Sequence, residues 1–225
     1  MVKLLSVKTR RSGSTRAAFR RHYEERHVPL GLGFIDRFRW RKYVRNHVLD
    51  VASGEVDFDC LTEFWFATRA DQASTARFAA TDEFRVLDED DRRFLDVDRR
   101  LACELGEAVL AGERPPCDPP GTRRVAALFS LPAGRLEGGG EAFVAAVERD
   151  ARSLAAEAVA AGGWLSFDRR VTSGPRPEAF AAIVSLWSAP GREPAPLRWK
   201  GEAEPAAVVL LDVVETPPAR LYRAA

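Results

Sequence analysis

Four prolines fall within ten residues near the middle of this 225-residue chain, and they constrain its fold more than any other feature. They lie in the segment 112–121, which reads Gly-Glu-Arg-Pro-Pro-Cys-Asp-Pro-Pro-Gly. Because proline fixes one backbone angle and lacks an N–H donor, this segment can form neither a helix nor a central strand. We therefore predict a linker at residues 112–121, which separates one domain at residues 1–111 from another at residues 122–225.

Both halves show the same predicted order of elements, strand-helix-strand-strand-helix-strand. Strands are expected at 2–7, 37–47, 58–67 and 101–110 in the first half, and at 124–131, 164–172, 179–188 and 206–215 in the second. This order is that of the ferredoxin-like fold, so the predicted class is α+β. Two such repeats can cover each other's open sheet faces, so we predict that they form an intramolecular dimeric α/β barrel.

The helix ends are predicted from capping residues and prolines. Ser14 or Thr15 is expected to cap the first helix, because either hydroxyl can accept a hydrogen bond from a free first-turn N–H. That helix is expected to end near His27, since Pro29 follows. Asp71 is expected to cap the second helix. The second half predicts a helix at 141–161, but the proline-rich region 190–205 indicates that its other helix is short or lost.

Composition excludes several classes of protein. The net charge of +1 indicates neither nucleic-acid nor membrane binding. Cys60, Cys103 and Cys117 are an odd number without close spacing, which predicts neither a disulfide framework nor a zinc motif. No apolar run is as long as a transmembrane helix, and the first residues lack the pattern of a signal peptide. A cytoplasmic protein is the default expectation, and many Arg and Ala against few Lys indicate a high-GC bacterial source.

Charge is distributed unevenly along the chain. Residues 1–49 contain 13 Lys or Arg and 3 acidic residues, whereas residues 82–98 contain 8 acidic residues and 3 Arg. Such blocks are typical of solvated surface, and the acidic run Asp88–Asp91 is expected to be exposed helix. The alternative is that the two blocks lie near each other or bias the approach of an anionic ligand.

Three motifs in the first half resemble those of the EthD family. The segment 15–30 matches the family's first-helix motif, the strand 58–66 matches its third strand with Glu63 two positions before an aromatic residue, and the segment 90–96 matches its acidic-Phe-Asp motif. Asp91 stands where that last motif usually has Glu. The residues that match the first motif are Phe19, His22, Tyr23, His27, Pro29 and Leu30. Since the second half shows none of these motifs, we expect a degenerate second repeat.

The resemblance implies a dimeric α/β barrel with an apolar cavity in the barrel, here as a monomeric pseudo-dimer or a homodimer. It implies a hydrophobic, aromatic small molecule as partner and no metal or organic cofactor. Relatives include cyclases, dehydratases, decarboxylases and oxygenases of polyketide pathways, and accessory proteins of ether degradation. The resemblance therefore implies a site rather than one reaction.

Two histidines of the first helix are catalytic candidates. His27 ends that helix, where the helix dipole favours a protonated imidazole, and its ordinary pKa lets it give or take a proton near neutral pH. The alternative is that it only bonds the last carbonyls. His22 lies five residues earlier, about 140° around an α-helix, so the two imidazoles should not share a face. Their spacing does not suit zinc, and His22 could instead pair with Glu25 or with an acid outside the helix.

Glu63 is a third catalytic candidate, because it lies in the middle of the most hydrophobic strand of the first half. The alternation of side chains puts it on one face with Asp59, Leu61 and Trp65. If that face lines the barrel, Glu63 is a carboxylate in an apolar cavity, and burial would raise its pKa and make it a usable acid or base. The alternative is a structural pairing with Arg39 or Arg41.

Tyr43 is the fourth catalytic candidate, since it could hold a substrate carbonyl or phenol. It is expected to share a strand face with His47, although the neighbouring arginines are also consistent with a solvated edge. If the Glu63 face lines the barrel, Trp65 is expected to stack against a flat ring, and the alternative is that it packs in the core. The substrate-binding candidates are Trp65, Tyr23, His47 and Trp40.

The sequence thus favours a cofactor-independent enzyme of aromatic polyketide or secondary metabolism. Proton transfer by His27 with Glu63 or Tyr43 would lead to cyclisation, dehydration or decarboxylation. Two alternatives remain open at this point: a non-catalytic protein that binds a hydrophobic ligand, and a cofactor-free oxygenase.

Overall fold

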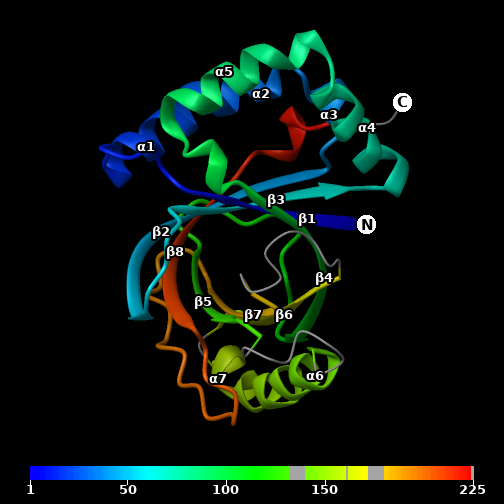
Figure 1. Cartoon of the computed structure of the whole chain (residues 1–225). Coiled ribbons are helices and arrows are strands. Elements are labelled where there is room, and N and C mark those ends of the chain that lie inside the picture. The colour runs from blue at the N-terminus through cyan, green and yellow to red at the C-terminus, as the bar shows by residue number, and fades with distance from the viewer. Residues whose placement is uncertain (132–139, 161, 172–179, 224–225) are drawn as a thin grey trace. The chain divides into compact units, whose positions relative to one another are not determined.

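A computed structural model describes residues 1–131, 140–160, 162–171 and 180–223 (Figure 1). Eight antiparallel strands form a closed barrel in the hydrogen-bonded order β1-β3-β2-β8-β5-β7-β6-β4, which confirms the mixed α+β class and the barrel. The strands are β1 (Val2–Lys8), β2 (Lys42–Gly54), β3 (Cys60–Phe66), β4 (Leu101–Ala111), β5 (Arg123–Phe129), β6 (Trp164–Arg170), β7 (Ala182–Ser188) and β8 (Ala207–Glu215).

The chain divides into two compact units, and neither is a continuous stretch of sequence. The first comprises Met1–His47, Asp57–Ala102 and Glu215–Ala225, and the second comprises Val48–Val56 and Cys103–Val214. The proline-rich segment 112–121 contains neither helix nor strand, as predicted.

In the first unit, helices cover one face of the sheet β1-β3-β2. The helices are α1 (Arg16–His22), α2 (Val28–Leu32), α3 (Ile35–Phe38), α4 (Arg69–Ala79) and α5 (Arg85–Phe94), and a π-helical turn (Tyr23–His27) joins α1 to α2. Figure 1 shows α1, α2 and α5 on the same side of these strands. Phe19, Phe66 and Phe94 belong to the apolar core that forms on this side.

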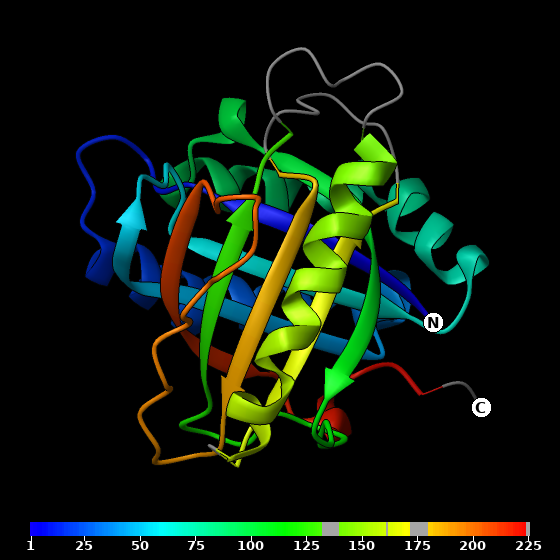
Figure 2. The same ribbon diagram turned by 90° about the horizontal axis from the view of Figure 1, so that it is seen from below.

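The second unit is built on β5, with β7 and β8 paired to its two edges. The helices are α6 (Gly140–Ala151) and α7 (Ala155–Ala160). Figure 2 shows α6 in front of the strands of this unit and running nearly along them, and Phe143 and Val147 of this helix enter the core of the unit. Residues 189–206 contain no helix, which confirms the expected loss.

Two helix predictions need correction. Thr15 caps α1 as expected, because its hydroxyl accepts from the N–H of Ala18 at 3.1 Å. However, the helical path does not end near His27 but continues to Leu32. Pro29 is tolerated in the first turn of α2, where its missing N–H does not remove a needed hydrogen bond. Thr68, not Asp71, caps α4 by accepting from the N–H of Asp71.

The strand predicted at residues 37–47 begins too early. A short helix, α3, ends at Arg39, which has a left-handed backbone with φ of 59°, and the strand starts only at Lys42. The other seven predicted strands are confirmed, with ends shifted by a few residues. The element ends predicted at Ala161, Thr172 and Ala179 lie outside the described residues.

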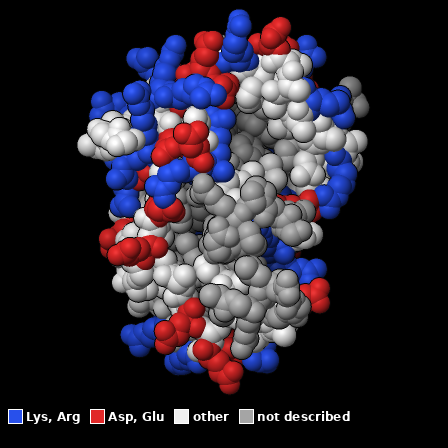
Figure 3. Space-filling model, in the orientation of Figure 1, with Lys and Arg blue, Asp and Glu red and all other residues white. Residues whose placement is uncertain are grey.

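The basic and acidic blocks of the sequence lie near each other in the first unit. Arg37 approaches Glu83 to 3.4 Å, and α1 contributes histidines that contact acidic side chains of α5. Figure 3 shows basic and acidic side chains intermingled over the helices of this unit. None of the helices within the described ranges is long and apolar enough to cross a membrane.

Candidate functional site

A cavity of about 160 Å³ lies in the first unit, on the helix-covered side of the sheet β1-β3-β2. Aromatic rings form much of its wall, among them Phe38, Phe64 and Phe84. Of the predicted site residues, His27, Tyr43, Tyr23 and Trp40 line it, together with the polar side chains of Lys8, Thr75 and Asp91. An apolar pocket with a few convergent polar groups is the usual form of a small-molecule site.

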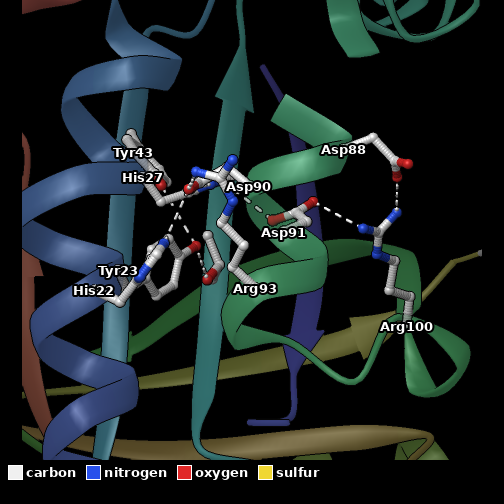
Figure 4. A network of polar contacts seen from close by, with 10 residues as sticks. His22, Tyr23, His27, Tyr43, Asp88, Asp90, Asp91, Arg93 and Arg100 are labelled. Carbon is white, nitrogen blue, oxygen red and sulfur yellow. Dashed lines mark hydrogen bonds and ion pairs between the residues drawn. The ribbon is translucent and has the colours of Figure 1, made fainter. Parts of the chain in front are cut away.

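The π-helical turn brings His22 and His27 to the same side. The N–H of Val28 bonds the carbonyl of Tyr23, five residues back, so the turn is wider than that of an α-helix. His22 Nε2 lies 3.0 Å from one carboxylate oxygen of Asp90, and His27 Nδ1 lies 3.0 Å from the other (Figure 4). The prediction that the two imidazoles do not share a face was wrong, because it assumed 3.6 residues per turn.

The acidic run on α5 is not simply exposed surface. Asp90 and Asp91 are each 6% exposed, and both turn toward His27. The two aspartates share the buried face of α5 with Leu87 and Phe94. The i, i+3, i+4, i+7 spacing of these residues was the sequence signal that could have identified the two aspartates.

Asp90 determines which nitrogens of the histidines carry protons. The hydrogen bond from His27 lowers the pKa of Asp90, burial opposes this effect, and the hydrogen bond from His22 adds to it. An ionised carboxylate only accepts hydrogen bonds, so His22 Nε2 and His27 Nδ1 must both donate. A neutral His27 therefore has its lone pair on Nε2, which is the nitrogen that can remove a proton.

Asp91 occupies the other side of the His27 ring. Its Oδ1 lies 3.4 Å from His27 Nε2, and its Oδ2 accepts from Arg100 at 3.0 Å (Figure 4). Within the described residues, Oδ1 is buried and makes no hydrogen bond. Arg100 also bonds Asp88 at 3.1 Å and thereby holds Asp91 in place.

Tyr23 and Tyr43 form a buried hydroxyl chain beside the histidines. The hydroxyls of Tyr23 and Thr62 are 2.8 Å apart, and the Tyr43 hydroxyl donates to that of Tyr23 at 3.4 Å. Burial raises the pKa of both tyrosines. Both phenols therefore stay protonated near neutral pH and can donate a hydrogen bond, but cannot act as bases.

Glu63 and Trp65 lie on the opposite face of the sheet and do not line this cavity. Glu63 is fully buried, and its carboxylate lies 3.2 Å from the ammonium of Lys3, which also lies over the Trp65 ring. Its partner is thus Lys3, and not Arg39 or Arg41 as considered above. The structure does not bring Glu63 and His27 together.

His47 also lies outside the cavity, in a buried ionic cluster. Its Nε2 is 2.6 Å from the Glu24 carboxylate, which also accepts from Arg45 at 2.9 Å. Burial alone would raise the pKa of Glu24, but the hydrogen bonds from His47 and Arg45 lower it to about 2. Burial alone would lower the pKa of His47, but Cys60 and Glu24 outweigh it and raise this pKa to about 9.

We expect this cluster to make stability depend on alkaline pH. Because the pKa of His47 is raised from 6.5 to about 9, its contribution is fully present below pH 6.5 and is lost as the pH rises through 9. The loss should be about 3 kcal/mol, at 1.36 kcal/mol per pKa unit. Urea denaturation at pH 6.5 and 10 should show it in the native protein but not in a His47→Gln variant. Equal losses in the two proteins would contradict this assignment.

Other reactive groups of the described chain form no second site. No group of three or more His, Cys, Asp or Glu side chains among the described residues is placed to hold a metal ion. Cys60 and Cys103 are buried thiols, and Cys117 is exposed. Burial raises the pKa of Cys103 to about 11, so this thiol is a poor nucleophile near neutral pH.

Comparison with known proteins identifies the domain that carries the site. Residues 11–98 match the sequence model of the EthD domain. The match includes His22, His27, Asp90 and Asp91, so the cavity and its ionisable groups belong largely to this domain. It ends before the proline-rich segment. Among curated proteins, no sequence relative was found.

Two solved structures are similar to this chain at low sequence identity. A mutant chlorite dismutase from Candidatus Nitrospira defluvii is 10% identical, with 96% of this chain and 92% of that chain covered and a TM-score of 0.43. A protein described as "Putative monooxygenase" from Fusobacterium nucleatum is 9% identical, with 84% and 77% covered and a TM-score of 0.46. Nothing about activity follows from likeness at this level.

Proposed function

We propose that the EthD domain catalyses proton transfer on a hydrophobic aromatic molecule, with His27 as the acid–base group and without a cofactor. One observation carries this proposal: His27 lines an apolar cavity while Asp90 holds its Nδ1. The lone pair of a neutral His27 is then on Nε2. When His27 takes a proton, the carboxylates of Asp90 and Asp91 stabilise the imidazolium.

The reaction that follows depends on the substrate. Removal of a proton next to a carbonyl gives an enolate, which can attack a second carbonyl or expel a β-hydroxyl group that takes up the proton from His27 and leaves as water. In a decarboxylation, loss of carbon dioxide from a β-keto acid gives the enolate, and His27 supplies the proton that the enolate carbon takes up. Tyr43 lines the same cavity and its phenol stays protonated, so it can donate to a substrate oxygen in place of its long 3.4 Å hydrogen bond to Tyr23. We therefore propose cyclase, dehydratase or decarboxylase chemistry in aromatic polyketide or other secondary metabolism.

Two other functions have specific support. Asp91 Oδ1 already lies beside His27 Nε2, which would suit a protein that binds a ligand without turning it over. Trp40 and His27 line the same cavity, which would suit a cofactor-free oxygenase of phenols.

We also propose that residues 1–111 and 122–225 are two ferredoxin-like repeats, the second of them degenerate. The strand order supports this, because β4-β1-β3-β2 and β8-β5-β7-β6 are the same permutation of four strands. A single chain would then correspond to a dimer of one-repeat proteins.

A panel of aromatic and polyketide-like acids and ketones tests the function. The purified protein is mixed with each compound anaerobically and in air, products are followed by mass spectrometry, and tryptophan quenching reports binding through Trp40. Product without oxygen supports proton transfer, and product only in air supports oxygenation. Binding without product across the panel would contradict catalysis and favour the binding protein.

A further inference from the structure

We propose that Lys8 binds an anionic oxygen of the ligand, and that the cavity accepts a single-ring phenol, held as its phenolate. This role of Lys8 rests on the function proposed above and specifies the substrate class of the same site. No motif of the sequence marks Lys8 as a site residue.

The size of the cavity suits one ring. The cavity of about 160 Å³ is close to the volume of roughly 150 Å³ at which an engineered apolar cavity holds one benzene. The rings of Tyr43 and Phe64 are stacked 5.1 Å apart, and Trp40 packs against both. A flat ring of similar size fits such walls, whereas a fused polycyclic molecule could enter only in part.

Most polar groups in the wall already have partners. The hydroxyls of Tyr23 and Tyr43 bond within their own chain, and the Thr75 hydroxyl donates to the carbonyl of Phe38. Lys8 is different, because its ammonium makes no hydrogen bond or ion pair with any residue in the described part of the chain. Asp91 Oδ1 likewise makes no hydrogen bond there.

The charge around Lys8 favours an anion. Burial lowers the pKa of its ammonium, and the carboxylate of Asp91 opposes this effect. Arg100 bonds that carboxylate through Oδ2, so part of the charge of Asp91 is already neutralised. An anionic oxygen in the cavity would give Lys8 the direct hydrogen-bonded partner that the described residues do not supply, and charge-assisted pairs of this kind are strong when desolvated.

The protons balance if His27 accepts one. The phenol transfers the proton of its hydroxyl to His27 Nε2, its oxygen keeps the electron pair, and this oxygen pairs with the ammonium of Lys8. The resulting imidazolium lies between Asp90 and Asp91, at 3.0 Å and 3.4 Å. No bond other than the O–H bond breaks, and no oxidant or reductant is needed.

Binding of 4-nitrophenol tests this proposal, because its phenolate absorbs visible light and its phenol does not. The native protein is titrated with the probe at a pH where the free probe is mostly protonated. We expect the absorbance of the phenolate to appear on binding. Nitrobenzene, which has the same ring and no hydroxyl, should bind less tightly, as measured by competition or tryptophan quenching. Tighter binding of nitrobenzene by the native protein would overturn the proposal without any variant.

A Lys8→Met variant keeps the length of the side chain and removes its charge. It should bind the phenolate roughly tenfold to a hundredfold more weakly, the loss expected for a charged hydrogen bond, but bind nitrobenzene as before. Lys200→Met removes an exposed lysine and should leave both affinities unchanged. Lys8→Arg keeps the positive charge and should therefore retain the phenolate absorbance. A purely structural role of Lys8 would not require this result.

Each result bears on one proposal only. Undiminished phenolate binding in Lys8→Met would show that Lys8 does not hold the anion. Failure of the native protein to bind either probe would show that the cavity does not accept a single ring. Neither result would affect the assignment of His27, which is judged by turnover of the substrate that the panel identifies.

Discussion

Replacing His27 with alanine should lower turnover of an accepted substrate by about 10²- to 10⁴-fold, the range typical of a general acid–base group. His27 is the imidazole in the cavity wall, and Asp90 leaves its Nε2 as the nitrogen that can remove a proton. The fall should appear in kcat, because the variant keeps most of the cavity wall and should bind the substrate with similar affinity. Steady-state kinetics with the substrate found in the panel measures it, and tryptophan quenching reports the affinity separately.

His22→Ala is the matched control for His27→Ala. His22 bonds the same carboxylate, Asp90, at the same distance of 3.0 Å but does not line the cavity. Its loss should therefore affect turnover much less. Full turnover in His27→Ala would show that His27 is not the acid–base group, whereas equal losses in the two variants would indicate that both histidines act only by holding Asp90.

Replacing Glu24 with alanine should destabilise the protein by about 3–5 kcal/mol. Glu24 accepts hydrogen bonds from both Arg45 and His47, whose side chains are 4% and 3% exposed. Without this carboxylate, two cationic groups would remain buried without their principal anion. An unpaired buried charge destabilises the fold by more free energy than an exposed ion pair contributes. Urea denaturation at pH 7 measures the change in the free energy of unfolding.

Glu25→Ala tests whether this effect is specific to the buried cluster. Glu25 is the next residue of the same helical turn but is exposed, so its replacement should change stability by no more than about 0.5 kcal/mol. A loss below about 1 kcal/mol in Glu24→Ala would mean that Arg45 and His47 find other partners or that water reaches them.

Much of the fold could be predicted because its signals are local. Four closely spaced prolines indicate a segment without regular structure, and alternation or apolar runs locate seven of the eight strands. The start of β2 could not be predicted in this way. Arg39 takes a left-handed backbone that only glycine commonly adopts, and no pattern in the sequence marks such a residue.

The candidate site was predicted in part. The EthD motif identified His27, and the cavity wall includes it, Tyr43, Tyr23 and Trp40. The pairing of the two histidines was missed because periodicity arguments assume an α-helix, whereas residues 23–27 form a wider turn. The sequence does not show which face of the sheet Glu63 occupies, because β3 is buried on both faces. Alternation of polar and apolar residues distinguishes the two faces only when one of them is exposed to solvent.

The division of the chain has a practical consequence for anyone who alters its last residues. Glu215–Ala225 belong to the same unit as the cavity, although more than a hundred positions separate them in sequence from β3. The N–H of Tyr222 bonds the carbonyl of Trp40, and the N–H of Thr216 bonds that of Tyr43. Both partners line the cavity. A substitution within residues 216–222 therefore acts next to the cavity wall, so changes made there should be compared with the native protein before any assay result is interpreted.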